Sequence, residues 1–220
     1  MRCLKLSDKY KKQVLLRYFA LEGVDKVGKT TIFNKLKDEF KNNKNIIFVS
    51  EPSTKLKKVI YYIIKNKLAF IFLRWILPFL FYFDRLFHIK KVKEYIKNGF
   101  VVASDRCVLS SFVYQGFLGW FLNKNLPIPE HIFFIKLRRD FLEKRHKNIK
   151  NLDSIESNFK AIKNNQDYYE FILKKLYSNN QFSYSHHFNE QKVDLIFEVD
   201  NISRILILKT NLKGNAYENN

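Results

Sequence analysis

Short apolar runs alternate along this chain with longer stretches in which apolar and polar residues recur at a helical period. Five of the runs are rich in β-branched and aromatic residues, and they cover residues 17–22, 46–50, 100–104, 131–137 and 193–199. The stretches between them are long enough for the crossover connections that parallel strands require. The pattern therefore predicts an α/β fold in which a five-stranded parallel sheet carries helices on both faces.

The domain organisation follows from the same pattern. We expect a single domain over residues 15–213, preceded by a basic N-terminal extension (residues 1–14) and followed by a short tail (residues 214–220). A polar segment at about residues 146–158 interrupts two helical stretches, which predicts a flap over the site. The polar stretch before the last predicted strand reads as a loop, and its adjacent His186 and His187 lack the further ligands of a metal site.

The longest apolar run, residues 68–83, could be mistaken for a membrane span. It is 16 residues long, which is shorter than the roughly 20 residues that a bilayer requires. Arg74 lies near its middle, where an arginine costs about 2.5 to 3.5 kcal/mol on insertion into a membrane. We therefore expect a buried or pocket-lining helix.

Composition narrows the choice of partners. Forty Lys and Arg residues against 21 Asp and Glu give a net charge of +19, but the lysines are scattered and no nucleic-acid-binding motif accompanies them. The two cysteines, Cys3 and Cys107, offer no disulfide framework, and no cleavable signal pattern opens the chain. We expect a cytoplasmic protein with no nucleic-acid partner and no membrane partner.

A phosphate-binding loop follows the first predicted strand. Residues 23–30 read G-x-x-x-x-G-K-T between a strand and a helix, which is the context that this motif requires and which predicts a fold of the P-loop NTPase type. Backbone N–H groups would surround the phosphates, Lys29 would reach the β- and γ-phosphate oxygens, and the Thr30 hydroxyl would hold Mg²⁺. The predicted ATP-binding residues are Gly23, Val24, Asp25, Lys26, Val27, Gly28, Lys29, Thr30 and Thr31.

A second charged motif ends the third predicted strand, where FVVASDR places Asp105 and Arg106 in succession. Ligands of open parallel sheets bind beyond the carboxyl ends of the strands, so both residues should face the same crevice as the loop. There Asp105 would organise the metal together with Thr30, and Arg106 would clamp a phosphate.

Taken together, the motifs resemble thymidylate kinases, the P-loop enzymes that phosphorylate dTMP with ATP. The matching pieces are FALEGVDKVGKTT, EPS, LFYFDRLFH and SDRCVLSSFVYQG, with weaker similarity from LDSIE to FEVDN, and the likeness covers roughly residues 17–208. The resemblance implies transfer of the ATP γ-phosphoryl group to dTMP, Mg²⁺ as the cofactor, ATP and dTMP as partners, and a homodimer.

The resemblance also assigns the acceptor site. It implies that the Asp25 carboxylate faces away from ATP and accepts a hydrogen bond from the 3′-hydroxyl of the acceptor sugar. Phe81 would stack on thymine, Arg85 would donate to its O4 atom, and Tyr114 would occupy the space of a 2′-hydroxyl, although ordinary core packing remains an alternative for both aromatic residues. The predicted substrate-binding residues are Asp25, Glu51, Phe81, Arg85, Arg106, Ser110, Ser111, Tyr114 and Gln115.

Such a transfer needs no nucleophilic side chain, because catalysis consists of positioning and charge neutralisation. Three positions depart from the bacterial pattern: Ser50 and Ser154 replace arginines, and Cys107 replaces a tyrosine. The catalytic cations must then come from elsewhere. The predicted catalytic residues are Lys29, Arg106, Lys26 and Arg145.

Two other functions remain open at this point. Without an arginine at position 50, the acceptor could be a nucleoside without phosphate, which would make the protein a deoxynucleoside (thymidine) kinase. Without an arginine at position 154, the protein could be a catalytically weak nucleotide-binding regulator.

Overall fold

A five-stranded parallel sheet organises the structure, with the strands in the order β2-β3-β1-β4-β5. The computed structural model describes residues 13–53, 55–147, 159–176, 183–188 and 202–206. In chain order, its elements are β1 (Val14–Glu22), α1 (Lys29–Glu39), β2 (Ile46–Ser50), α2 (Leu56–Lys65), α3 (Lys67–Leu73), α4 (Leu77–Lys97), β3 (Val101–Asp105), α5 (Val108–Tyr114), α6 (Gly116–Asn123), β4 (Ile128–Lys136), α7 (Arg139–Lys147), α8 (Phe159–Leu176) and β5 (Ser183–Phe188).

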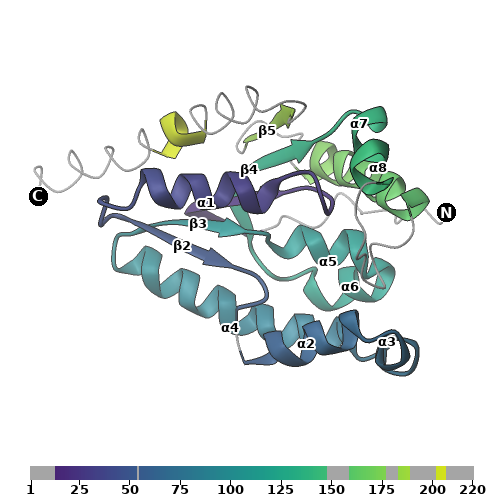
Figure 1. Cartoon of the computed structure of the whole chain (residues 1–220). Helices are drawn as coiled ribbons and strands as arrows, with labels where there is room; N and C mark the ends of the chain where they lie inside the picture. The colour runs from purple at the N-terminus through teal and green to yellow at the C-terminus, as the bar shows by residue number, and fades with distance from the viewer. Residues whose placement is uncertain (1–12, 54, 148–158, 177–182, 189–201, 207–220) are drawn as a thin grey trace, which may run out of the picture.

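Helices cover both faces of the sheet, with α1 on one side and α4 on the other (Figure 1). The α/β fold class and the five-stranded parallel sheet predicted from the sequence are therefore confirmed, with four of the predicted segments as strands. The first four predicted strands lie within three residues of β1, β2, β3 and β4 at each end. The domain boundary expected at residue 15 stays a prediction, although β1 begins at Val14 and the Gln13 carbonyl already accepts a hydrogen bond from the Ile128 N–H (2.9 Å).

The prediction of a loop before residue 193 is wrong, because the fifth strand of the sheet lies there. β5 lies in the stretch that the sequence analysis read as a loop, and it pairs in parallel with β4 from His131 opposite Ser183 to Lys136 opposite Phe188. An edge strand needs hydrogen-bonding partners on one side only, and such strands tolerate polar sequences like SYSHHF. The strand predicted at residues 193–199 lies outside the described residues.

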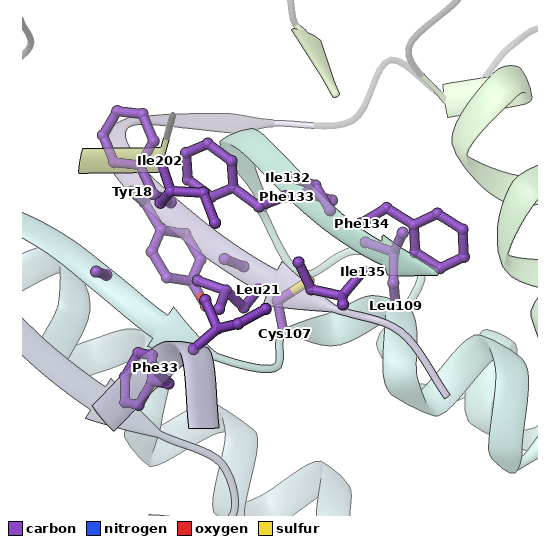
Figure 2. Packing of buried hydrophobic residues seen from close by; sticks show 14 of the residues in the cluster. Tyr18, Leu21, Phe33, Cys107, Leu109, Ile132, Phe133, Phe134, Ile135 and Ile202 are labelled. Carbon is purple, nitrogen blue, oxygen red and sulfur yellow. The ribbon is translucent and has the colours of Figure 1, made fainter. Parts of the chain in front are cut away.

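The core forms where the sheet meets its helices. Figure 2 shows Tyr18 and Leu21 of β1 packed among the apolar side chains of β4, with Leu109 of α5 and Cys107 beside them. These residues are fully buried. The central strands are mainly apolar because both of their faces are covered, which is the usual pattern of parallel sheets.

Between β2 and β3 the chain inserts three helices, α2, α3 and α4. A second apolar cluster joins α2 to α4 through Ile60, Ile63, Ile64 and Leu77. The run at residues 68–83 is therefore two helices rather than the one that we expected, namely α3 and the beginning of α4. In the part of the chain that the structure describes, no helix combines the length and the apolar character needed to cross a membrane.

Candidate active site

One cavity of about 1130 Å³ opens at the carboxyl ends of β1, β2 and β3. It is lined by the phosphate loop on one side and by α2, α3 and α4 on the other. The predicted site residues that line it are Asp25, Lys26, Gly28, Lys29, Thr30, Thr31, Glu51, Phe81, Arg85, Asp105, Arg106, Ser110, Ser111, Tyr114 and Gln115. The fold thus brings residues from both predicted subsites into a single space.

Four of the predicted site residues are not among the residues that line the cavity. Val24 and Val27 are fully buried in the core beneath the loop. Gly23 has a φ of +146°, and a Cβ atom there would lie 2.3 Å from the Ile135 carbonyl oxygen, so glycine is required for the loop to pass β4. Arg145 belongs to α7, but its side chain lies outside what the structure describes.

The phosphate loop holds its lysine in place without a ligand. The Lys29 ammonium is buried, donates a hydrogen bond to the Val24 carbonyl (2.6 Å) and lies 3.9 Å from the Asp25 carboxylate. Burial, together with the nearby Arg106 cation, lowers the pKa of Lys29 to about 8. The ammonium therefore stands in a partly desolvated position, where its interaction with a phosphate would be strong.

Asp25 and Arg106 form an ion pair inside the cavity. The Arg106 guanidinium also donates to the Ser110 hydroxyl (3.1 Å) and lies over the Tyr114 ring at 5.5 Å from its centroid. Burial raises the pKa of the Asp25 carboxyl, but Arg106 and Lys29 outweigh it and hold that pKa below its usual range. Asp25 is thus an anion whose charge is already balanced by two cations.

A buried network of hydrogen bonds connects Glu22 to Arg106 through Ser110. Glu22 is fully buried and accepts hydrogen bonds from the Cys107 N–H (2.8 Å), the Ser110 hydroxyl (3.0 Å) and the Tyr169 hydroxyl (2.9 Å). Burial raises the pKa of Glu22 despite the opposing Arg106 charge. Because Ser110 also accepts from Arg106, the network runs from α8 through Ser110 to the arginine.

On the acceptor side, Arg85 is buried and oriented by Glu51. Its Nε and Nη2 atoms both donate to Glu51 Oε2, at 2.8 and 2.6 Å, and its Nη1 atom donates to the Ser111 hydroxyl. Burial lowers the pKa of Arg85, but the Glu51 carboxylate raises it on balance. The Nε2 atom of His88 lies 3.6 Å from the other Glu51 oxygen, Oε1. The guanidinium is therefore fixed and charged before any ligand arrives.

The residues predicted to hold a metal fit a magnesium ion. Thr30 and Asp105 line the same cavity, and Asp105 Oδ1 is buried with no hydrogen-bond partner among the described residues. A carboxylate and a hydroxyl beside bound phosphates are the hard oxygen ligands that Mg²⁺ prefers. Within the described ranges, no group of three His, Cys, Asp or Glu residues forms an alternative metal site.

The cavity has further lining residues that the sequence analysis did not name individually, although Phe70, Arg74 and Trp75 belong to the run for which it predicted a buried or pocket-lining helix. The cavity is also lined by Tyr61, Phe70, Arg74, Trp75, Leu118 and Asn165. Pro78, Phe81 and Arg85 follow one another at helical spacing on α4 and all line the cavity, whereas Arg74 lies in the turn before this helix and had no such signal. Glu22 reads as the end of a strand and Tyr169 as part of an amphipathic helix, and neither carries a sequence signal for the network that joins them.

The three departures from the bacterial pattern have different surroundings. The Cys107 side chain is fully buried, and the backbone N–H of this residue donates a hydrogen bond to Glu22. Ser50 is partly exposed at the end of β2, next to Glu51. Ser154 and most of the expected flap lie outside the described residues.

The comparisons with known proteins all point to the same family. A family model described as thymidylate kinase matches residues 21–192. The thymidylate kinase of Helicobacter pylori (strain HPAG1) is 34% identical over 145 residues, which cover 64% of this chain and 72% of that protein. The thymidylate kinase of Nautilia profundicola is 34% identical over 153 residues, with 63% and 73% covered.

Solved structures share the fold. A thymidylate kinase structure from Ehrlichia chaffeensis matches with a TM-score of 0.60 at 21% identity, covering 88% of this chain and 99% of that one. A thymidylate kinase structure from Candida albicans matches with a TM-score of 0.63 at 16% identity, covering 88% and 92%. Since the family model extends from β1 beyond β5, the chain belongs to the thymidylate kinase family.

Proposed function

We propose that this protein is a dTMP kinase, which transfers the γ-phosphoryl group of ATP to dTMP and releases dTDP and ADP for dTTP synthesis. The observation that carries the proposal is the single cavity in which the phosphate loop faces the Phe81–Arg85 helix face. A phosphoryl donor and an acceptor nucleotide in this space would meet beside Lys29 and Arg106. The family relationship favours this reading over a thymidine kinase or a regulatory protein.

The donor half of the site binds ATP. Backbone N–H groups of the loop surround the phosphates, and Lys29 neutralises the charge that develops on the transferred group. Thr30 and Asp105 would hold Mg²⁺, which supplies charge neutralisation on the β- and γ-phosphate oxygens when bound. Lys26 in the loop and Arg145 on α7 are the further cations that we assign to the transferred phosphoryl group.

The acceptor half selects thymine. The Arg85 guanidinium donates to the thymine O4 atom, and Phe81 stacks on the ring. Cytosine carries an amino group at the same position, and two donors facing each other would leave both unpaired in a buried place. Ser111, which already bonds to Arg85, faces the N3 edge of the base, and Tyr114 excludes a 2′-hydroxyl.

The sugar and phosphate of dTMP lie between the two halves. Arg106 binds the acceptor phosphate, and Asp25 accepts the hydrogen bond of the 3′-hydroxyl. Gln115 faces the cavity with a buried Oε1 atom that has no hydrogen-bond partner in the described part of the chain, so it offers an acceptor to the ligand. Catalysis then consists of alignment of the acceptor phosphate with the γ-phosphoryl group, and no side chain has to form a covalent bond.

An ADP-release assay tests the proposal. The purified protein is incubated with Mg²⁺-ATP and, in parallel, with dTMP, dUMP, dCMP, thymidine or no acceptor. Fast release with dTMP and only background release without an acceptor is the expected result. Higher kcat/KM for thymidine than for dTMP would make the protein a nucleoside kinase, and ATP binding without acceptor-dependent turnover would make it a regulator.

We also propose a cytoplasmic homodimer. The exposed side of α4 carries Phe79, Phe83 and Phe87 at four-residue spacing, which forms an apolar stripe along one helix face. Such a stripe suits the packing of α4 against a second copy of itself. Phe83→Glu should convert the dimer to a monomer in sedimentation velocity experiments, whereas Phe171→Glu, at another exposed aromatic position on α8, should not.

A further inference from the structure

Helix α3 exposes a cluster of large apolar side chains to solvent. Its sequence is KLAFIFL, yet none of its seven residues is buried. Leu68 is 68% exposed, Phe72 76% and Trp75, just beyond the helix, 70%. We refer to Leu68, Ile71, Phe72, Trp75 and Ile76 as the α3 tip. Contiguous apolar surface of this kind marks a docking site on soluble proteins.

The fold holds this helix in an outward position. Figure 1 shows α3 at the periphery of the molecule, away from the sheet. Its first turn is capped by Asn66, whose side chain accepts a hydrogen bond from the Ala69 N–H (3.1 Å). Phe70 faces inward and lines the active-site cavity. The remaining apolar residues of α3 are therefore presented outward by a helix that is anchored at one side.

The chain segment that carries the α3 tip has charges of one sign. Residues 52–83 contain six basic residues and no acidic one. All six side chains are exposed: Lys55, Lys57, Lys58, Lys65, Lys67 and Arg74. A second copy of the chain docking on the same patch would bring these cations against each other, so the charge favours a different, anionic occupant.

Among possible anionic occupants, a lipid surface matches both the exposed apolar side chains of the α3 tip and the basic residues of the same segment. Three of the five α3-tip residues are leucine or isoleucine, which offer no ring on which a nucleic-acid base could stack but insert readily between acyl chains. Tryptophan prefers the interfacial region of a bilayer, and phenylalanine and leucine are typical of the apolar face of helices that bind there. Stable attachment of a peripheral protein needs two signals, and a basic patch beside an apolar insertion supplies both.

We propose that the α3 tip inserts into the interface of a membrane that contains anionic lipids, with the lysines of α2 and α3 on the headgroups. The expectation of no membrane partner rested on the lack of a spanning segment, and peripheral attachment does not need one. Because Phe70, Arg74 and Trp75 also line the cavity, the attached surface lies next to the acceptor half of the active site. The proposal is independent of the kinase activity, and its failure would leave the proposed function intact.

Vesicle binding tests this inference on the full chain. The sequence holds two tryptophans, so Trp120→Phe leaves Trp75 as the single fluorescent reporter. Its emission should shift to shorter wavelength with vesicles of phosphatidylcholine and phosphatidylglycerol, and should stay unchanged with phosphatidylcholine alone. Co-sedimentation with the same vesicles should decrease as salt is raised, because screening weakens the headgroup attraction.

Two variants and a matched control identify the surface. Lys65→Glu/Lys67→Glu should weaken vesicle binding at least about 25-fold, since each lysine at an anionic surface contributes about fivefold. Leu68→Ser/Phe72→Ser should weaken binding more than about tenfold by removal of inserted apolar area. Phe171→Ser/Lys174→Glu on α8 makes the same kind of change elsewhere and should bind like the unaltered chain.

The proposal is overturned by equal binding to neutral and anionic vesicles, by an unshifted Trp75 emission, or by retained binding of the α3 variants. It is also overturned if Leu68→Ser/Phe72→Ser changes the oligomeric state while the unaltered chain binds no vesicles, since the patch would then be a contact between copies. The charge-reversed variant alters only exposed residues, so it should keep its far-UV circular dichroism spectrum.

Discussion

The Arg85–Glu51 pair gives the sharpest prediction for the acceptor half of the site. Both side chains are 3% exposed, and two N–H groups of Arg85 share one oxygen of Glu51 at 2.6 and 2.8 Å. Arg85→Gln removes the guanidinium but leaves the carboxylate in place without its counter-charge. Breaking a buried pair in this way costs about 3 to 5 kcal/mol in the free energy of unfolding.

A double-mutant cycle isolates the interaction. Urea unfolding of the unaltered chain, Arg85→Gln, Glu51→Gln and the double variant gives four free energies. The double variant should lose less than the sum of the two single losses by about 1.5 kcal/mol or more, because its two amides leave no charge without a partner. Arg74→Gln is the matched control: this arginine lines the same cavity but is exposed, and its loss should change stability by less than about 0.5 kcal/mol.

The same variant tests the choice of base. A hydrogen bond to a charged group contributes about 1.5 to 3 kcal/mol, so Arg85→Gln should lower the preference for dTMP over dCMP in kcat/KM by roughly tenfold to 150-fold. Additive unfolding free energies would refute the coupling that the distances indicate. An unchanged ratio of the two kcat/KM values would refute the role of Arg85 in base selection.

Three further predictions concern the donor loop and its support. Lys29→Ala should abolish ADP release while the urea midpoint stays near that of the unaltered chain, and retained turnover would contradict the assignment of the loop. Asp25→Asn should reduce kcat/KM for dTMP by roughly tenfold to 150-fold but reduce it much less for 3′-deoxy-dTMP, which lacks the hydroxyl; equal reductions would rule out that contact. Tyr169→Phe should lower the free energy of unfolding by about 1 to 3 kcal/mol, because Glu22 loses a buried donor; an unchanged midpoint would show that water replaces the hydroxyl.

The parts of the fold that the sequence predicted are those with a local signal. The runs that became β1, β2, β3 and β4 are apolar because their strands are covered on both faces, and the P-loop motif fixes where β1 ends and α1 begins. β5 could not be found in this way, since the strand is held by pairing with β4 and its own sequence is polar. The run at residues 68–83 lines the cavity in part, as predicted, but the exposure of the α3 tip was missed because an apolar run predicts burial whatever its surroundings.

The residues of the candidate site likewise fall into those that a local motif predicted and those that only the tertiary structure reveals. Residues in contiguous motifs, such as Lys29, Asp105 and Arg106, line the cavity as their positions after the strands predicted. The contact between Glu22 and Tyr169 joins residues 147 positions apart, and no local pattern encodes it. Tertiary packing alone creates such a network, so the structure is needed to find it.

The carboxylate of Asp25 is the least expected feature of a phosphate-binding loop, and its surroundings explain why it is tolerated. Arg106 lowers the pKa of Lys29, because two neighbouring cations repel, whereas Asp25 raises it. The carboxylate bonds to Arg106 and lies 3.9 Å from Lys29, so the three groups together carry one positive charge instead of two. Removal of Asp25 would therefore leave two partly desolvated cations facing each other. An anion in the loop thus favours the charged form of Lys29 and holds Arg106 beside it, at the point where the proposed mechanism would pass the phosphoryl group between them.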